Sequence, residues 1–329
     1  MDTKPRVLIW PDVRRTIEEA KLNQPTGQVQ EQIRAKAKEL LEQHQVQGVI
    51  GYEAGSRGQV RPAFIYDAND VDRLVWNQGC THNLTLYMHD KKKPAKKGEQ
   101  PPRVAIVVKP CDSRDLNVLI SESQIERERV YVIGVACDGI LKGSGFAMQS
   151  AISNPLKGKI PQSPLQDRCL RCGERVPVVY DVLIGEPPQV NVQDDFADIA
   201  RLEAMTPAER VAFWLKQYDR CIRCYACRQV CPGCYCNVCM FERDDSLWTG
   251  IATGVKEKEF FHLGRAYHLA ARCVECNECE RVCPMELPLS MLNRKLAKEV
   301  RELFQFRAGV EPVKAPLLTM LAEGEEPLI

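Results

Sequence analysis

The chain has 329 residues, of which 44% are hydrophobic and 27% charged, and its formal net charge is +1. This length accommodates about two or three domains, and the near-neutral charge argues against a strongly basic nucleic-acid-binding protein. No apolar run approaches the roughly 18 residues of a membrane span, and the first residues lack the long apolar core of a secretory signal. We therefore expect a cytoplasmic globular protein without a membrane span. Its 16 cysteines indicate thiols that bind metals in a reducing compartment rather than form disulfides.

The first part of the chain begins with a predicted helix and short strands. Hydrophobic residues recur at helical spacing between residues 29 and 43, which indicates an amphipathic helix. Apolar runs with turn residues between them follow at 49–50 and 63–66, and we expect a short strand at each. The lysine-rich stretch 91–97 contains proline and has glycine next to it, so we expect a solvated loop there, with docking of an acidic partner as the alternative.

Two further apolar runs predict a parallel β-α-β unit. Residues 104–108 and 130–135 are nearly continuous and rich in β-branched side chains, as is typical of strands buried on both faces. Residues 114–121 between them are numerous enough for a short helix. The N-terminal half is therefore predicted to have an α/β fold.

A cysteine follows each of those two strands, Cys111 after the first and Cys137 after the second. Sites in parallel α/β sheets lie beyond the carboxyl ends of strands, so these thiols are expected to be neighbours. Cys169 and Cys172 add a C-x2-C pair further on, and the four together could hold a 4Fe-4S cluster. The alternatives are that Cys111 and Cys137 are buried structural thiols and that the pair forms a zinc knuckle.

Helices are predicted through most of the remaining chain. Residues 194–203 and 206–218 have helical character, and Thr206 with Glu209 forms a capping box at the start of the second. Another helix is expected within 247–272, and one more after Pro288. The buried side of the helix within 247–272 is expected to consist of Phe260, Phe261, Leu263, Tyr267 and Leu269, with His262 and His268 as packing or surface residues.

Two runs of the pattern C-x2-C-x2-C-x3-C-P dominate the last third of the chain. The first comprises Cys221, Cys224, Cys227 and Cys231, and the second comprises Cys273, Cys276, Cys279 and Cys283. This spacing is typical of two-cluster bacterial ferredoxins, in which the fourth cysteine of each run binds the other cluster. We therefore predict one 4Fe-4S cluster on Cys221, Cys224, Cys227 and Cys283, and a second on Cys273, Cys276, Cys279 and Cys231. Zinc is the alternative, but zinc sites usually pair two C-x2-C halves.

The four remaining thiols are Cys80, Cys234, Cys236 and Cys239. They could hold a fourth metal centre, but the C-x-C spacing found here is not part of the bacterial or plant-type ferredoxin patterns. Inert thiols packed beside the ferredoxin loops are the favoured interpretation.

Charge differs between the two ferredoxin runs. Arg220, Arg223 and Arg228 surround the first, whereas glutamates at 275, 278 and 280 are interleaved with arginines around the second. Because positive charge favours the reduced cluster, we hypothesise that the first cluster has the higher potential. Solvated charges without a tuning role are the alternative.

The combination resembles a known family over roughly residues 70 to 305. The stretches VAIVVKPCDSRDLNVL, VYVIGVACDG and CLRC resemble the beta subunits of deazaflavin-coenzyme-reducing hydrogenases and formate dehydrogenases. The stretches RCIRCYACRQVCPGCYCNVC and RCVECNECERVCP are similar to a ferredoxin-fused branch often associated with heterodisulfide-reductase-like complexes. The resemblance implies that Cys111, Cys137, Cys169 and Cys172 hold a third 4Fe-4S cluster, and it implies a bound FAD.

The expected organisation is an α/β hydrogenase-beta-subunit-like domain at 1–193 and a mainly α two-cluster ferredoxin domain at 194–306, with a tail at 307–329. We expect a non-catalytic iron-sulfur subunit that relays single electrons between a catalytic oxidoreductase and a flavoprotein partner in an anaerobic redox complex. One alternative is a flavin-dependent reductase acting on a deazaflavin, quinone or disulfide. A regulator with structural or redox-sensing clusters is the other.

Overall fold

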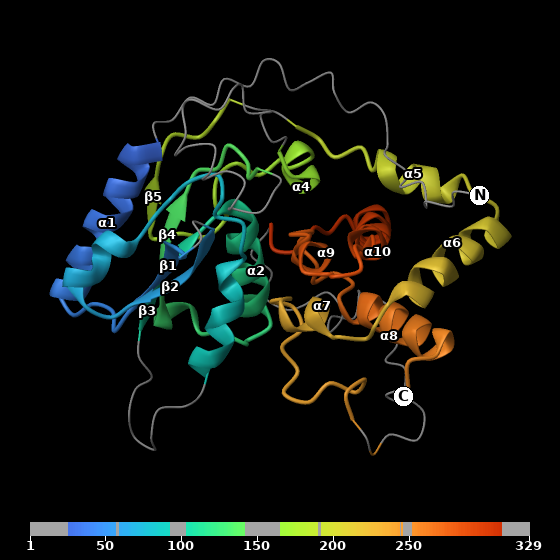
Figure 1. Ribbon diagram of the computed structural model, residues 1–329. Helices are drawn as coiled ribbons and strands as arrows, with labels where there is room; N and C mark the ends of the chain where they lie inside the picture. The colour runs from blue at the N-terminus through green and yellow to red at the C-terminus, as the bar shows by residue number, and fades with distance from the viewer. Residues whose placement is uncertain are drawn as a thin grey trace, which may run out of the picture.

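The computed structural model describes residues 26–56, 59–92, 103–141, 165–189, 192–243, 245 and 252–310. These residues form a mixed α/β sheet region and a C-terminal region of helices and cysteine-bearing loops (Figure 1). The predictions for Lys93, Lys96 and Lys97 and for the tail beyond residue 310 lie outside the described residues. No helix in the described part of the chain is long and apolar enough to cross a membrane. The boundaries expected at residues 193 and 306 stay predictions.

The sheet has five strands in the order β2-β1-β3-β4-β5. The strands are β1 (Val49–Ala54), β2 (Val60–Ile65), β3 (Val104–Val108), β4 (Val130–Val135) and β5 (Val182–Ile184). Strands β1, β3, β4 and β5 run parallel, and β2 is antiparallel at one edge. The two strands predicted as buried have the predicted bounds and pair in parallel. The sequence did not suggest β5, because three residues are too few for a periodic pattern.

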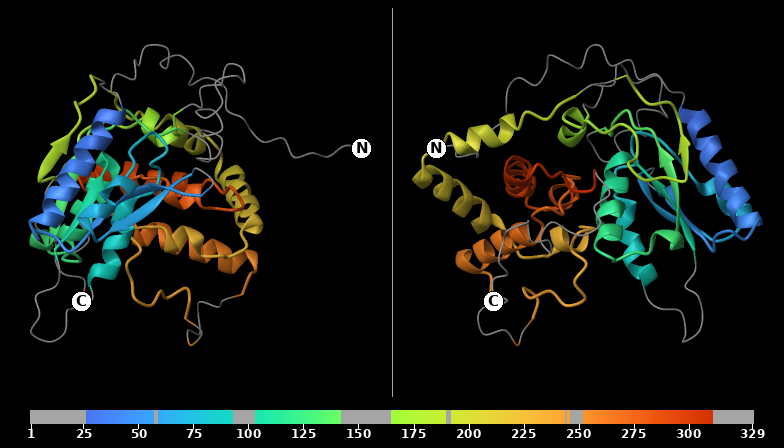
Figure 2. Two further views of the ribbon diagram at one scale, coloured as in Figure 1. Left: turned by 60° about the vertical axis from the view of Figure 1, so that its left-hand side comes forward. Right: turned by 180° about the vertical axis from the view of Figure 1, so that it is seen from behind.

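Helices cover both faces of the sheet, as a parallel sheet requires. Helix α1 (Thr26–Glu42) lies on one face and α2 (Pro110–Ser121) on the other (Figures 1 and 2). Helix α1 was predicted, and it buries Ile33, Ala37 and Leu40. Helix α2 begins earlier than the predicted residue 114, because Pro110 suits a first helical position and the Lys109 N–H is bound by Asp112 Oδ2 at 3.2 Å. Cys111 therefore lies in the first turn of α2.

The other helices of the sheet region are short, namely η2 (Ala68–Arg73), η3 (Leu84–Lys92), η4 (Arg127–Arg129) and α4 (Asp167–Leu170). The C-terminal region contains α5 (Ala197–Glu203), α6 (Pro207–Arg220), α7 (Ala226–Gln229), α8 (Val255–His268), α9 (Glu278–Arg281) and α10 (Leu289–Phe304). The predicted helices correspond to α5, α6, α8 and α10. The predicted capping box is confirmed, since Thr206 N donates to Glu209 Oε2 at 2.8 Å and Glu209 N donates to Thr206 Oγ1 at 3.3 Å.

The predicted buried side of α8 is wrong in part. Phe261 and Leu269 are buried, but Phe260, Leu263 and Tyr267 are 44%, 37% and 64% exposed. The helix instead buries Lys258, His262 and Arg265. These polar side chains are buried because they satisfy groups of the neighbouring cysteine loop and of α6, such as the Asp219 and Cys227 carbonyls. Hydrophobic periodicity alone could not reveal that side of the helix.

The C-terminal region packs on the α2 side of the sheet (Figure 2). Val118 of α2 shares a hydrophobic cluster with Val274, Cys276 and Ala308. Arg114 Nη2 donates to the Ala308 carbonyl at 3.0 Å, and Asn117 Nδ2 donates to the Gly309 carbonyl at 3.2 Å. The first residues after α10 are therefore ordered against this chain's own sheet region.

Replacement of Gly309 tests that packing. Gly309 has a φ of +70°, and a Cβ there would lie 2.1 Å from the Arg114 carbonyl oxygen. We expect Gly309→Ala to lower the free energy of unfolding by about 1–3 kcal/mol, because the backbone must move away from α2. Denaturant unfolding measures the loss, and faster amide exchange at residues 307–310 localises it. Gly27→Ala is the control, because a Cβ at Gly27 meets nothing within 4 Å. If Gly309→Ala had the stability and the amide exchange rates of the wild-type protein, this packing would be contradicted.

Candidate iron-sulfur centres

The first candidate centre is a cavity of about 320 Å³ lined by Cys221, Cys224, Cys227 and Cys283. The structure thus brings the fourth cysteine of the second run to the first three cysteines of the first run. Phe261, Leu287 and Leu289 form apolar walls around them. Four thiols around an apolar cavity are a donor set that fits a 4Fe-4S cluster.

The two cysteine loops repeat the same backbone conformation. In the first, Arg223 and Tyr225 have φ values of +50° and +57°; in the second, Glu275 and Asn277 have +62° and +55°. In each loop the N–H two residues after the first cysteine donates to that cysteine's Sγ, at 3.3 Å in the first and 3.4 Å in the second. A main-chain donor aimed at sulfur is an arrangement that stabilises a thiolate ligand.

The second candidate centre comprises Cys273, Cys276, Cys279 and Cys231. Burial raises the pKa of Cys279 to about 11, and the neighbouring Cys231 adds to that shift. Burial also raises the pKa of Cys273 and of Cys276 well above the ordinary value, again with a contribution from Cys231. These contributions support the predicted grouping of Cys231 with the first three cysteines of the second run. Metal ligation would replace the proton that burial otherwise holds on each thiol.

The third candidate centre lies between the two regions of the chain. One cavity of about 1020 Å³, part of it open to solvent, is lined by Cys111, Cys137, Cys169 and Cys172 together with Cys273. The Gly139 N–H donates to Cys137 Sγ at 3.4 Å, and the Ile140 N–H donates to Cys169 Sγ at 3.3 Å. All four predicted cysteines thus meet at one cavity, and the donor set fits a 4Fe-4S cluster.

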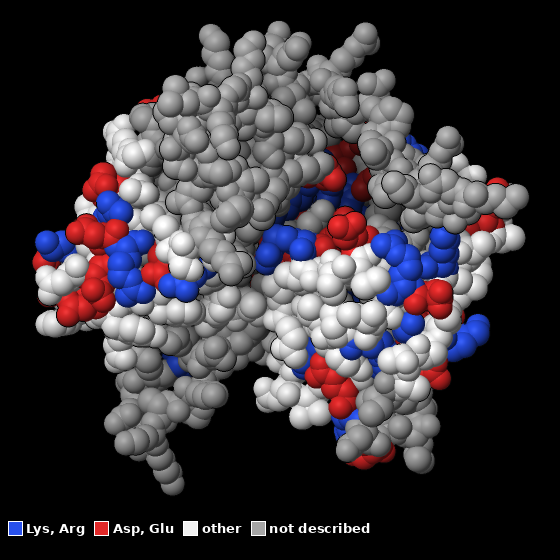
Figure 3. Space-filling model, viewed as in Figure 1, with Lys and Arg blue, Asp and Glu red and all other residues white. Residues whose placement is uncertain are grey.

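Basic side chains gather at this cavity. The space-filling view shows a hollow between the two regions with basic and acidic groups at its walls (Figure 3). The arginines that line the cavity are Arg114, Arg168, Arg171, Arg175, Arg301 and Arg307. Glu174, Asp194 and Glu275 also line the cavity, and Glu174 pairs with Arg114 and Arg307. The arginines outnumber these acids, and an excess of positive charge favours negatively charged contents, either a cluster with thiolate ligands or another anionic cofactor.

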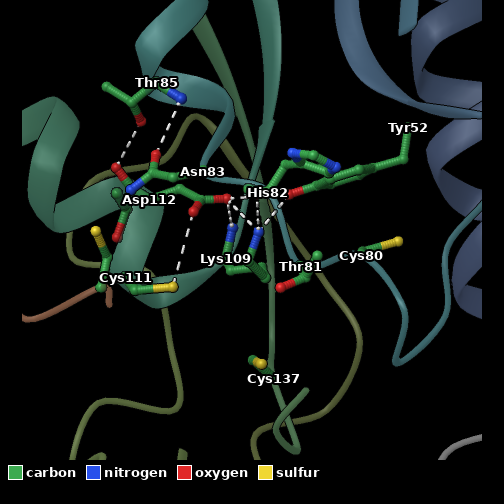
Figure 4. Close-up of polar contacts among 12 residues, drawn as sticks. Tyr52, Cys80, Thr81, His82, Asn83, Thr85, Lys109, Cys111, Asp112 and Cys137 are labelled. Carbon is green, nitrogen blue, oxygen red and sulfur yellow. Dashed lines mark hydrogen bonds and ion pairs between the residues drawn. The ribbon is translucent and has the colours of Figure 1, made fainter. Parts of the chain in front are cut away.

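A buried ion pair fixes the position of Cys111 (Figure 4). Lys109 and Asp112 are fully buried, and their side chains are 2.8 Å apart. Lys109 Nζ also donates to the His82 carbonyl at 2.8 Å and to the Tyr52 hydroxyl. The Cys111 thiol donates to Asp112 Oδ1 at 3.7 Å. This network holds the end of β3 and the first turn of α2 together, and the sequence signal for it is the charged pair around Pro110 and Cys111.

His262 lies closer to a candidate ligand than the sequence suggested. Its Nε2 is 3.2 Å from Cys221 Sγ, and its ring stacks on Tyr218. Burial lowers the pKa of His262 to about 3, so the ring is neutral. His262 is a packing residue, as predicted, because its ring stacks on Tyr218. The sequence contains no sign of its contact with Cys221 Sγ, because the two residues are 41 positions apart.

The glutamates of the second run are paired with arginines. Glu278 receives two hydrogen bonds from Arg281, at 3.0 and 2.6 Å, and lies 3.7 Å from Arg168. Glu275 receives a hydrogen bond from Arg294. The predicted difference in reduction potential between the first and second clusters depends on the negative charge of these glutamates, and the ion pairs offset that charge. The difference stays a prediction.

The other four thiols do not meet at one site. Cys80 is buried in the core of the sheet region, where it accepts the Asn77 N–H at 3.4 Å. Cys234 hydrogen-bonds the Cys231 thiol, and Cys236 is exposed. Within the described residues, no group of three or more His, Cys, Asp or Glu side chains is arranged to hold a single metal ion.

Comparisons with known proteins found one similar domain and similar full-length chains. A family model described as a 4Fe-4S dicluster domain matches residues 217–287. The F420-dependent formate dehydrogenase subunit beta of Methanocaldococcus jannaschii is 23% identical over 88% of this chain and 94% of the relative. The F420-dependent formate dehydrogenase 1 subunit beta of Methanococcus maripaludis is 23% identical over 87% and 92%.

The predicted resemblance to formate dehydrogenase beta subunits is thus confirmed, whereas the link to heterodisulfide-reductase-like complexes stays a prediction. The dicluster match and the relatives together support the predicted function of an iron-sulfur electron-transfer subunit of an oxidoreductase complex.

Iron content tests the crossed pairing of the two runs. The double variant Cys283→Ala/Cys224→Ala should lose about four irons per chain, because both thiols belong to one site. Cys283→Ala/Cys276→Ala should lose about eight, because it disables two sites. Iron and sulfide analysis after anaerobic purification measures both, with Cys236→Ser as the control at full content. The opposite ranking would mean that each run keeps its own fourth cysteine.

Proposed function

We propose that this chain relays single electrons through three 4Fe-4S centres between a catalytic oxidoreductase and a flavoprotein partner. The cysteine sets are those described above, with Cys111, Cys137, Cys169 and Cys172 as the third. The observation that carries the proposal is the order of these sets, which follow one another from the surface of the C-terminal region to the edge of the sheet. A bound 4Fe-4S cluster accepts and donates one electron at a time.

The first set is the one at the surface. Cys224 is exposed, and its neighbour Ile222 is 55% exposed. Cys221 and Cys227 of this set share a hydrophobic cluster with Cys279 of the second set. Cys273 of the second set lines the same cavity as the third set. In this order, electrons would enter or leave the relay at the first cysteine set and at the third.

The relatives suggest the setting of the relay. Both carry names of F420-dependent formate dehydrogenase beta subunits, so we propose that this chain belongs to a complex of similar kind, with a formate dehydrogenase, a hydrogenase or a heterodisulfide-reductase-like protein as a partner. A relay must be docked at both ends, which favours a permanent complex in the cytoplasm over a free carrier. The chain itself then needs no catalytic residue.

A second candidate function is a flavin-dependent reductase. The cavity at the third set has about three times the volume of the cavity at the first, about 1020 against 320 Å³, and several arginines line it. The positive charge suits a phosphate-bearing flavin such as FAD beside the cluster. Tightly bound flavin in the purified chain would favour this function, with a deazaflavin, quinone or disulfide as acceptor.

Metal and flavin analysis decides how many centres the chain holds. We expect about twelve irons per chain, because the structure offers three cysteine sets of four. Iron, sulfide and flavin are counted on the anaerobically purified complex and again for Cys169→Ala, which should retain about eight irons. A wild-type content of about eight irons would contradict the third centre.

Relay function is tested in the intact complex. Cys169→Ala should abolish reduction of the flavoprotein partner by the catalytic subunit, because it interrupts the path at the sheet. The same variant should leave reduction of an artificial one-electron dye by the catalytic subunit unchanged. Cys236→Ser, which alters an exposed thiol outside the three sets, is the matched control. Undiminished transfer to the flavoprotein in Cys169→Ala would contradict the relay.

A further inference from the structure

Two buried arginines stand between consecutive cysteine sets. Arg168 and Arg265 are each only 6% exposed. Neither belongs to a cysteine run, since Arg168 comes from α4 in the sheet region and Arg265 from α8 in the C-terminal region. A buried guanidinium is costly unless negative charge or hydrogen-bond acceptors surround it, so each needs an explanation.

Arg168 joins the third set to the second. Its Nη1 donates to the main-chain carbonyl of Cys276, and its Nη2 donates to the Thr81 carbonyl at 2.9 Å. The same side chain lines the cavity of the third set. Burial lowers the pKa of Arg168, but nearby groups that can carry negative charge outweigh burial and raise it above the ordinary value. These groups are Cys111, Glu278, Cys169 and Cys276. Two of these thiols belong to the third set and one to the second.

Arg265 occupies the equivalent place between the second set and the first. Its Nη2 donates to the main-chain carbonyl of Cys227 at 3.0 Å. Burial again opposes the charge, and nearby thiols raise the pKa of Arg265 well above the ordinary value. Those thiols are Cys234, Cys231, Cys279 and Cys227. Cys234, which makes the largest contribution, belongs to none of the three sets and hydrogen-bonds Arg265. Cys227 of the first set, whose carbonyl Arg265 binds, shares a hydrophobic cluster with Cys279 of the second set.

The guanidinium Nε atoms of both arginines have no hydrogen-bond partner among the described residues. An orphaned donor inside a protein is uncommon and calls for an acceptor. Thiolate or sulfide sulfur is the acceptor that each neighbouring site would supply. Hydrogen bonds to cluster sulfur and nearby positive charge both raise the reduction potential, and a low local dielectric strengthens the effect.

We propose that Arg168 and Arg265 act as positioning residues that raise the reduction potentials of neighbouring centres in pairs. Arg168 acts on the second and third centres, and Arg265 acts on the first and second. Reduction adds negative charge to a centre, and two adjacent centres repel each other through that charge. The positive charge of the arginine between them offsets this repulsion, so an electron can occupy either of the two centres. This inference rests on the proposed function, because it presupposes three centres.

Paired substitutions test the inference through midpoint potentials. Arg168→Gln keeps a donor for the Cys276 carbonyl but removes the charge. It should lower the reduction equilibrium constants of the second and third centres about tenfold, equal to about 59 mV for a one-electron couple, and leave the first unchanged. Arg265→Gln should lower the reduction equilibrium constants of the first and second centres and leave that of the third unchanged. The measurement is an EPR-monitored redox titration of the purified chain, with signals assigned from the cysteine variants.

Conservative and remote substitutions provide the controls. Arg168→Lys and Arg265→Lys keep the positive charge and should recover at least half of each shift. Arg73→Gln removes an exposed arginine of the sheet region that pairs with Glu53 and should leave all three potentials unchanged.

Two results would overturn the inference. The first is that both Gln variants keep their full iron content and their midpoint potentials are unchanged. The second is that the midpoint potentials of the Lys variants fall as far as those of their Gln counterparts. Failure of the proposed function has a different signature, because the wild-type chain would then lack the irons or the EPR signal of the third centre.

Discussion

The contact of Arg168 with the Cys276 loop links the two regions of the molecule. Its guanidinium reaches from α4 to the main-chain carbonyls of Cys276 and Thr81, and Glu278 lies 3.7 Å away. Because the bond to the Cys276 carbonyl is buried and the bond to Thr81 is partly buried, they hold the second ferredoxin loop against the carboxyl edge of the sheet. The third cysteine set faces the second for this reason, and the cavity between them has walls from both regions.

The sheet supplies the other half of the arrangement. Parallel strands end at one edge, and β3 and β4 there lead directly into Cys111 and Cys137. The buried pair of Lys109 and Asp112 then fixes the first turn of α2 and with it the Cys111 thiol. In the C-terminal region two loops of the same backbone conformation present their thiols around separate sites. The α/β sheet and the repeated loop together place the candidate sites next to one another.

Much of the candidate site could be predicted from sequence, because cysteine spacing and strand ends are local signals. The repeated C-x2-C-x2-C-x3-C-P pattern predicted that Cys283 and Cys231 exchange partners, and the strand ends predicted that Cys111 and Cys137 are neighbours. The residues that sequence missed act over long range. Arg168, Arg265 and His262 are charged or polar side chains buried by contacts with other elements, and no periodicity marks them. The same cause misplaced the buried side of α8, where Arg265 and His262 replace the expected Leu263 and Tyr267.

We propose that this chain carries three one-electron centres in series. Coulometric reduction of the purified, flavin-free chain under anaerobic conditions tests it directly, since each 4Fe-4S centre takes up one electron. We expect uptake of about three electrons per chain, with Cys169→Ala taking up one fewer. Uptake of about two electrons by the wild-type chain would confine the centres to the C-terminal region and contradict the account.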